Sequence, residues 1–225
     1  MSQKNNYPKI AIDGPAGTGK STVTREVSRR LRLKYLDTGA MYRAITLKLL
    51  REKVDLSDDQ ALEDILQRTV IKLNDKQEVF LNGEDVTEEI RGAAVNKMVS
   101  PVAAISRVRR RLVEMQRAIA AESGGIVMEG RDIASKVMPD ADFKFYLDAT
   151  LAERARRRWK EQNDKGIILS GEEVMAEIKN RDSIDSKRDD SPLTSVFDAI
   201  VIDTTSMDFE AVVDKIVDTI SADLP

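Results

Sequence analysis

Residues 14–21 read GPAGTGKS and lie between an apolar run, KIAID at 9–13, and a stretch that we expect to be helical from about Lys20 to Leu33. They match the pattern G-x-x-x-x-G-K-[ST], in the strand-before, helix-after context that the pattern requires. Glycines let successive backbone N–H groups turn toward one anion, and the helix N-terminus adds about half a positive charge. The sequence therefore predicts a loop that binds a nucleoside triphosphate, with Lys20 on the β- and γ-phosphates and Ser21 on Mg²⁺.

Short apolar runs alternate along the chain with longer segments of helical periodicity. The expected strands cover 9–13, 34–37, 124–130, 143–148 and 199–204. The expected helices cover 20–33, 39–53, a segment from about 57, 101–122, a segment from about 150, 170–189 and 208–221, with capping-box spacing at Ser57, Thr150 and Ser170. This alternation predicts an α/β fold with a five-stranded parallel sheet flanked by helices.

The segment VIKLNDKQEVFLNGEDV at 70–86 has a different pattern, because its apolar and polar residues alternate singly around NDK and NG. Such alternation predicts a small, partly exposed antiparallel hairpin. Since it interrupts the strand–helix order, we expect 68–98 to be an inserted lobe. The core domain is then expected to consist of 1–67 and 99–225.

The chain contains no cysteine and no histidine. This excludes disulfides, thiolate nucleophiles, imidazole acid–base chemistry and His-ligated metals, so a bound metal needs oxygen ligands, as Mg²⁺ and Ca²⁺ do. The first residues are polar, and no apolar run approaches the roughly 18–20 residues of a membrane span. With a net charge of −3, we expect a cytoplasmic protein without a nucleic-acid or membrane partner.

One segment departs from this mild acidity, since RARRRWK at 154–160 has five positive residues in seven. A solvated helix face, a nucleic-acid backbone and a small nucleotide are three interpretations of it. Arg154, Arg157 and Arg158 have i, i+3, i+4 spacing, which places them on one helix face. The segment spans only about 9–10 Å, whereas a duplex binder needs about 6–10 phosphate contacts over a broad surface. The compact patch suits one triphosphate.

Four segments together resemble the bacterial cytidylate kinases, a family of P-loop nucleoside monophosphate kinases: IDGPAGTGKST, LDTGAMYRA, EGRDIAS and IKNRDSIDSKRDDSPL. The similarity extends from about Ile10 to Ile220. It implies an inserted lobe that binds the nucleoside monophosphate and a helical lid at about 154–170. It also implies ATP-dependent phosphorylation of CMP and dCMP to CDP and dCDP, with Mg²⁺ as cofactor, ATP as co-substrate and a monomeric enzyme.

The resemblance also assigns residues. It implies catalytic roles for Lys20, Arg131, Arg188 and Arg158. It implies ATP contacts for Gly14, Pro15, Ala16, Gly17, Thr18, Gly19, Lys20, Ser21, Thr22, Arg154, Arg157 and Arg158. It implies CMP contacts for Thr38, Tyr42, Arg43, Ser100, Arg109, Arg131, Asp132, Arg181, Asp185 and Arg188. It implies Mg²⁺ at Ser21, with Glu129 acting through water. Glu129 stands where the family has Asp, and it is longer by one methylene. Ala134 and Ser135 replace the family's Gly and Thr.

Position alone leaves other readings open for several of these residues. Tyr42 is equally compatible with core packing and Arg43 with the surface, while the Arg131–Asp132 pair suits a buried structural ion pair. Three further residues fall within roughly 60° on one helix face, as an exposed ion-pair ladder also would: Arg181, Asp185 and Arg188.

Ser100 and Arg109 are nine residues, or two and a half helical turns, apart. One helix therefore does not place them on the same face, and the role of Ser100 depends on its lying at the start of the expected helix.

Two rival functions remain at this level. The first is a P-loop kinase for another small acceptor, such as UMP or shikimate. The second is a non-enzymatic ATP-binding module that regulates or binds nucleic acid. A guanine-specific GTPase is disfavoured, because NKMV at 96–99 lacks the acidic residue of N-K-x-D. Four arginines in the implied acceptor site favour an acceptor that itself carries phosphate.

Overall fold

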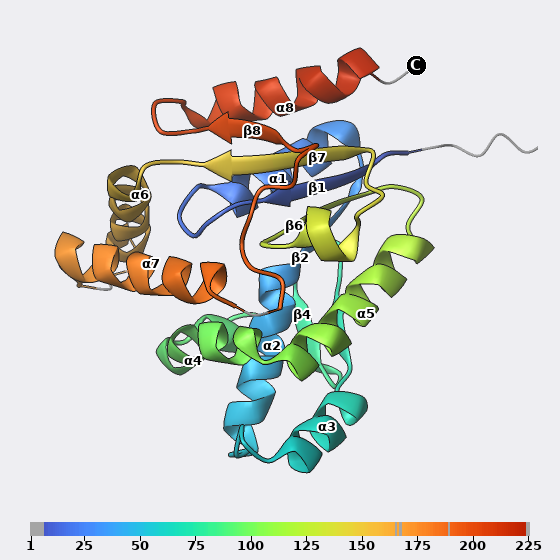
Figure 1. Cartoon of the computed structure of the whole chain (residues 1–225), viewed down its shortest axis with the longest axis vertical. Helices are drawn as coiled ribbons and strands as arrows, with labels where there is room; N and C mark the ends of the chain where they lie inside the picture. The colour runs from blue at the N-terminus through green and yellow to red at the C-terminus, as the bar shows by residue number, and fades with distance from the viewer. Residues whose placement is uncertain (1–6, 165, 167, 189, 224–225) are drawn as a thin grey trace, which may run out of the picture.

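Five strands pair into one parallel sheet with the order β2-β6-β1-β7-β8 in the computed structural model, which describes residues 7–164, 166, 168–188 and 190–223 (Figure 1). The strands are β1 (Lys9–Asp13), β2 (Lys34–Asp37), β6 (Ile126–Gly130), β7 (Phe143–Asp148) and β8 (Ile200–Asp203). All four pairings are parallel. The predicted five-stranded parallel sheet is thereby confirmed.

Helices cover both faces of this sheet. They are α1 (Lys20–Leu31), α2 (Thr38–Arg51), α3 (Asp59–Arg68), α4 (Ala93–Ala104), α5 (Ser106–Glu122), α6 (Leu151–Asp164), α7 (Gly171–Ser186) and α8 (Phe209–Asp223), with a 3₁₀ turn η1 (Glu89–Arg91) and a π turn η2 (Ile133–Val137). Successive side chains of a strand point to opposite faces. Accordingly, Ile10 and Ile12 pack with α1 and α8, whereas Ala11 packs with the cluster that contains α2 and α5. No helix among the described residues is long and apolar enough to cross a membrane.

The predicted hairpin is a three-stranded antiparallel sheet of β3 (Ile71–Leu73), β4 (Val79–Leu81) and β5 (Glu84–Asp85). Asn82 and Gly83 both have positive φ, 51° and 90°, which is the geometry of a tight two-residue hairpin turn. This turn adds the third strand that the sequence did not predict. Buried side chains of the small sheet share a core with α2, which leads away from the main sheet (Figure 1). Because α4 spans the expected boundary at residue 98, the division into lobes stays a prediction.

The helix predicted at 101–122 is wrong in one respect, since two helices occupy this region. α4 ends at Ala104, Ile105 is extended with φ −75° and ψ 115°, and α5 begins at Ser106. Pro101 suits a first helical turn, but here it lies inside α4, whose apolar face is buried. Ser100 therefore lies within α4 and Arg109 within a separate helix.

The capping predictions have mixed outcomes. Ser170 and Glu173 form the expected capping box at α7, which ends at Ser186, before the predicted end at residue 189, itself outside the described residues. At α3 the cap is Asp58 instead of Ser57, because the Asp58 carboxylate accepts from the N–H groups of Gln60 and Ala61.

At α6 the Glu153 N–H donates to Thr150 Oγ1 at 3.4 Å, but the Glu153 carboxylate binds arginines of its own helix instead of completing the box.

Candidate active site

The predicted phosphate loop, residues 14–19, follows β1 at the centre of the sheet, between β6 and β7. Gly14 has φ +146°, and a Cβ there would lie 2.0 Å from the Leu147 carbonyl oxygen. Gly17 has φ +82°, and its Cβ would lie 2.9 Å from the Arg154 carbonyl oxygen. Only glycine fits both the conformation and the close approach. The loop thus leads into α1 at the carboxyl edge of the sheet, where open α/β folds bind their ligands.

Lys20 begins α1 and is buried under this loop. Its Nζ donates to the Pro15 carbonyl oxygen at 2.6 Å and to Thr18 Oγ1 at 3.2 Å. Burial lowers the pKa of Lys20, and the nearby charge of Arg131 lowers it further. Both hydrogen-bond acceptors are neutral, and the nearby carboxylates of Glu129 and Asp13 only partly offset this lowering, so a phosphate would add counter-charge.

Ser21 and Glu129, the two residues predicted near a metal, are in contact. Ser21 Oγ donates to Glu129 Oε2 at 3.0 Å, and the Tyr35 hydroxyl donates to Glu129 Oε1. Burial is the main cause that raises the pKa of Glu129 to about 7, and Asp37 adds to it. The glutamate therefore reaches the end of the phosphate loop despite its extra methylene. Among the described residues, no cluster of three or more acidic side chains forms a ready metal site.

A cluster of arginines lies beside this loop. Burial and the neighbouring guanidinium of Arg131 lower the pKa of Arg181 to about 9, and Arg43 and Arg158 act in the same direction. Burial likewise lowers the pKa of Arg43 to about 10. Four like charges in mutual range, within a partly buried site, favour a bound anion.

Asp185 is the carboxylate of this arginine cluster. Arg131 Nε donates to Asp185 Oδ2 at 3.0 Å, and Arg188 Nη1 lies 3.6 Å from Asp185 Oδ1. Arg181 Nε and Arg188 Nη2 are buried, and neither has a partner in the part of the chain that the structure describes. Buried donors without acceptors cost free energy, so the site is incomplete without a ligand that carries acceptor oxygens.

A second buried ion pair joins α5 to the end of β6. Arg109 and Asp132 are paired, and their side chains are only 2% and 6% exposed. The Arg109 guanidinium also lies 5.8 Å from the centre of the Tyr42 ring, whose hydroxyl has no partner among the described residues. Ser100 is partly buried in α4. The alternative interpretation of Arg131 and Asp132 as one structural ion pair is wrong, because Asp132 pairs with Arg109 and Arg131 pairs with Asp185.

Two further predicted acceptor residues are bonded within the protein. Thr38 Oγ1 donates to the Glu129 carbonyl oxygen at 2.6 Å, which fixes the start of α2 against β6. Arg43 Nη1 donates to Asn96 Oδ1 on α4.

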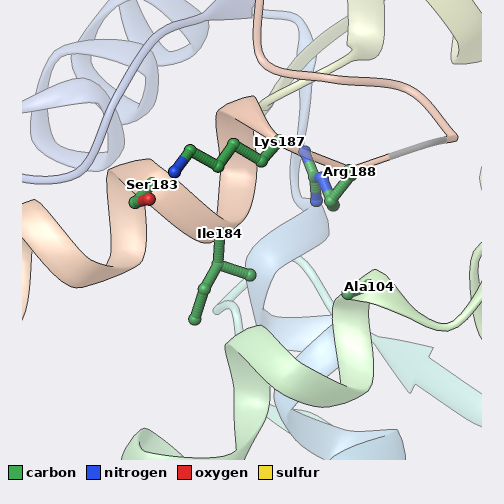
Figure 2. A pocket seen from close by; sticks show the side chains of 5 residues that line it. All are labelled: Ala104, Ser183, Ile184, Lys187 and Arg188. Carbon is green, nitrogen blue, oxygen red and sulfur yellow. The ribbon is translucent and has the colours of Figure 1, made fainter.

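A cavity of about 360 Å³ lies between α4 and α7, with Arg188 in its wall (Figure 2). The other lining residues are Ala104, Ser183, Ile184 and Lys187.

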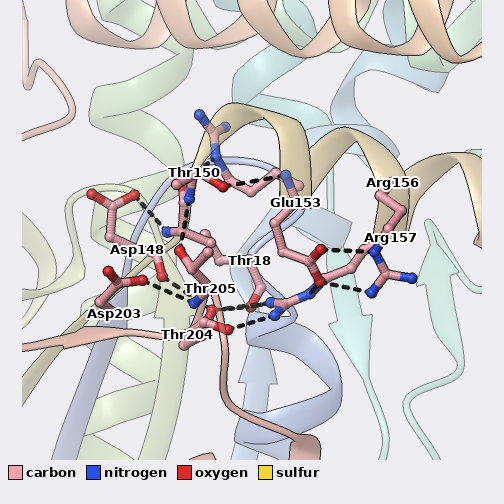
Figure 3. A network of polar contacts seen from close by, with 11 residues as sticks. Thr18, Asp148, Thr150, Glu153, Arg156, Arg157, Asp203, Thr204 and Thr205 are labelled. Carbon is pink, nitrogen blue, oxygen red and sulfur yellow. Dashed lines mark hydrogen bonds and ion pairs between the residues drawn. The ribbon is translucent and has the colours of Figure 1, made fainter.

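The three arginines predicted on one face of α6 have different surroundings. Arg157 donates to the Thr18 carbonyl oxygen at 3.3 Å and to the Thr204 carbonyl oxygen at 2.5 Å, which connects α6 to the phosphate loop and to the end of β8 (Figure 3). Arg154 is buried, whereas Arg158 pairs with Glu161 at 2.8 Å. Arg156 and Lys160 are exposed, as expected. In the predicted lid tip at 163–169, residues 165 and 167 lie outside the described residues.

Sequence reasoning missed several polar residues around the site. Asp13 accepts from the backbone N–H groups of Ile133 at 3.0 Å and Ala134 at 2.8 Å, and so fixes η2 beside the loop. Tyr35 holds Glu129, and Thr204 holds Arg157. Asp13 directly precedes the glycine-rich run, which is a signal that could have found it; Thr204 has no local signal, because only the sheet brings it near residue 18.

Comparison with known proteins adds the family. The model of the protein family described as cytidylate kinase matches residues 10–222 of this chain. The chain is 52% identical to a cytidylate kinase of Caldanaerobacter subterraneus over 94% of both chains. It is 51% identical to one of Pelotomaculum thermopropionicum over 97% of this chain and 98% of the relative. It is 47% identical to one of Bacillus subtilis over 94% and 95%.

Solved structures agree on the fold. A shikimate kinase of Bacteroides thetaiotaomicron superposes with a TM-score of 0.51 at 11% identity, covering 95% of this chain and 98% of that one. That likeness concerns the fold alone, whereas the sequence match spans nearly the whole chain. The chain therefore belongs to the cytidylate kinase family of nucleoside monophosphate kinases.

Proposed function

We propose that this kinase transfers the γ-phosphoryl group of ATP to CMP and dCMP, giving CDP and dCDP. The arginine cluster around Asp185 carries the proposal, because two buried donors there, Arg181 Nε and Arg188 Nη2, lack partners among the described residues. The phosphate of a nucleoside monophosphate supplies the missing acceptor oxygens and the missing negative charge. The phosphate loop beside it supplies the site for the donor nucleotide.

The reaction needs no strong base, since the attacking oxygen belongs to an ionised phosphate. Positioning and electrostatic stabilisation then carry catalysis. Lys20, Arg131 and Arg188 neutralise charge on the transferred group and on the acceptor phosphate, and Arg158 approaches from α6. Such a mechanism needs no imidazole acid or base, and the chain contains no histidine.

Mg²⁺ fits the oxygen atoms at the end of the phosphate loop. The Ser21 hydroxyl and the Glu129 carboxylate lie side by side there, and hard oxygen ligands are those that Mg²⁺ prefers. The Ser21 hydroxyl would hold the ion directly and Glu129 through water. When bound, the ion would neutralise charge on the β- and γ-phosphates.

On the acceptor side, the proposal assigns the base to Ser100, Arg109 and Asp132 and the ribose to Asp185, with Thr38, Tyr42 and Arg43 completing the pocket. The buried Arg109–Asp132 pair supports this, because a fixed pair presents one donor and one acceptor edge to a pyrimidine. The proposal includes a monomer that acts in the cytoplasm, with residues 68–98 as the acceptor lobe and 154–170 as the lid.

An acceptor panel tests the proposal. ADP release from ATP·Mg²⁺ would be followed with CMP, dCMP, UMP, AMP, GMP and shikimate, each alone. We expect fast turnover with CMP and dCMP only. Equal use of UMP would refute the cytosine-reading role of Ser100, Arg109 and Asp132, and turnover with shikimate alone would refute a nucleotide acceptor.

A further inference from the structure

Arg154 has a different environment from the other arginines of α6. Its side chain is 9% exposed, and its guanidinium is bonded to the protein on several sides. Arg154 Nε donates to the Ala149 carbonyl oxygen at 3.0 Å, and Nη1 donates to the Ala16 carbonyl oxygen at 3.1 Å. Nη1 also pairs with Asp182 Oδ2 on α7. One side chain thus connects the end of β7, the phosphate loop and α7.

The contact with the loop is tight. A Cβ on Gly17 would lie 2.9 Å from the Arg154 carbonyl oxygen and 3.0 Å from the Arg154 Cβ, so the loop packs directly on the first turn of α6. A carbonyl held by a guanidinium cannot rotate freely, and the next N–H group along the chain is held with it. The contact with Arg154 therefore constrains the orientation of the Gly17 N–H group in the loop.

The charge around Arg154 argues against contact with a triphosphate. Asp182 already compensates the guanidinium, and Asp182 Oδ1 is buried without a partner among the described residues. A phosphate placed against Arg154 would also meet the Asp182 carboxylate, whose negative charge offsets the attraction of the guanidinium. By contrast, Arg181 and Arg188 have buried nitrogen atoms with no partner in the described chain.

We propose that Arg154 and Asp182 are positioning residues that hold the phosphate loop in its ATP-binding conformation, and that Arg154 does not bind the triphosphate. The inference rests on the proposed function, since it takes the loop to be the ATP site. It differs from the ATP contact that the resemblance implies for Arg154. It also gives a role to Asp182, to which the resemblance assigns none: Asp182 helps to fix the conformation of the phosphate loop.

Asp182→Asn distinguishes a positioning role of Arg154 from a phosphate-binding role, because the two roles predict opposite changes in ATP affinity. If Arg154 positions the loop, removing the charge of Asp182 loosens Arg154 and weakens ATP binding, by roughly 10- to 100-fold for a loop displacement on the order of 1 Å. If Arg154 were a phosphate ligand, the same change would release it from a competing carboxylate and tighten ATP binding. Isothermal titration with ATP in the absence of acceptor measures this directly.

Further measurements exclude a merely structural effect. We expect the KM for ATP to rise while the KM for CMP stays unchanged, and Asp182→Glu to restore part of the ATP affinity. Asp198→Asn is the matched control, because Asp198 is exposed and pairs with Lys144 near the start of β7, whereas the loop follows the end of the parallel strand β1. If Asp182→Asn unfolds, Arg154→Lys, which keeps the charge but loses the planar fork, takes its place with the same expected weakening.

A lowered melting temperature with unchanged ATP affinity would overturn the proposal, as would tighter ATP binding. Failure of the wild-type chain to phosphorylate CMP would instead refute the proposed function, and the ATP titration would still decide the role of Arg154.

Discussion

Arg181→Met is expected to stabilise the ligand-free protein while weakening its binding of CMP. Arg181 lies on α7 among the guanidinium groups of Arg131, Arg43 and Arg158, and its Nε is buried without a partner in the described chain. Removing this charge relieves repulsion within the cluster. Asp185 keeps counter-charges, since Arg131 and Arg188 still lie 3.0 Å and 3.6 Å from its carboxylate.

The magnitude follows from the pKa of Arg181, which is lowered from 12.5 to about 9. That is about 3.5 pKa units, or at most about 5 kcal/mol at 1.36 kcal/mol per unit. Entry of water and movement of the neighbouring arginines reduce it, so we expect a gain of about 1–2 kcal/mol. For a chain of this length, that corresponds to a rise of about 3–6 °C in the melting temperature.

CMP binding should change in the opposite direction. A charge-assisted hydrogen bond to phosphate contributes about 1.5–3 kcal/mol, so its loss raises the Kd for CMP by roughly 10- to 150-fold. Thermal unfolding of the ligand-free protein and calorimetric titration with CMP measure the two effects. Arg156→Met is the control, because Arg156 is exposed and pairs with Glu153 on the same helix. A lower melting temperature, or an unchanged Kd, would refute the anion-site reasoning.

Three further predictions concern other parts of the site. Lys20→Met should reduce kcat by at least about 10²-fold with the fold intact, measured by ADP release and circular dichroism, because it removes a positive charge from the transferred phosphoryl group. Burial raises the pKa of Asp13 from 3.8 to about 6, so its contribution to stability is full below about pH 3.8 and is lost as the pH rises through about 6. Urea unfolding from pH 4 to 7 should therefore show wild type losing up to about 3 kcal/mol relative to Asp13→Asn, and a constant difference would contradict this assignment. Trp159 donates from Nε1 to the Leu169 carbonyl oxygen at 2.8 Å and is 41% exposed, so saturating ATP·Mg²⁺ plus CMP should change its emission, and unchanged emission would count against a lid at 154–170.

The layered fold was predictable because its signals are local. The apolar runs at 9–13, 34–37 and 143–148 coincide with β1, β2 and β7. Their alternation with helices permits little else than a parallel sheet. The break between α4 and α5 was not predictable from pattern, because Ile105 is apolar and fits a helical periodicity on both sides.

The sequence also did not predict which charged side chains pair with one another within the site. Spacing places Arg181, Asp185 and Arg188 near one another, and they do lie together. Nothing in the spacing distinguishes Arg154, which is bonded to Ala16 and Asp182, from Arg158, whose charge helps to lower the pKa of Arg181. Their partners come from α7 and from the loop after β1, and only the tertiary structure brings these segments together.

The most direct test of the account compares the affinities of CMP and cytidine, because the central claim is that the arginine cluster around Asp185 binds the acceptor's phosphate. Calorimetric titration should show wild type binding CMP at least about 10²-fold more tightly than cytidine, a preference worth at least about 2.7 kcal/mol. In Arg131→Met and Arg181→Met that preference should shrink while cytidine binding is retained. Equal affinity of wild type for CMP and cytidine would contradict the account.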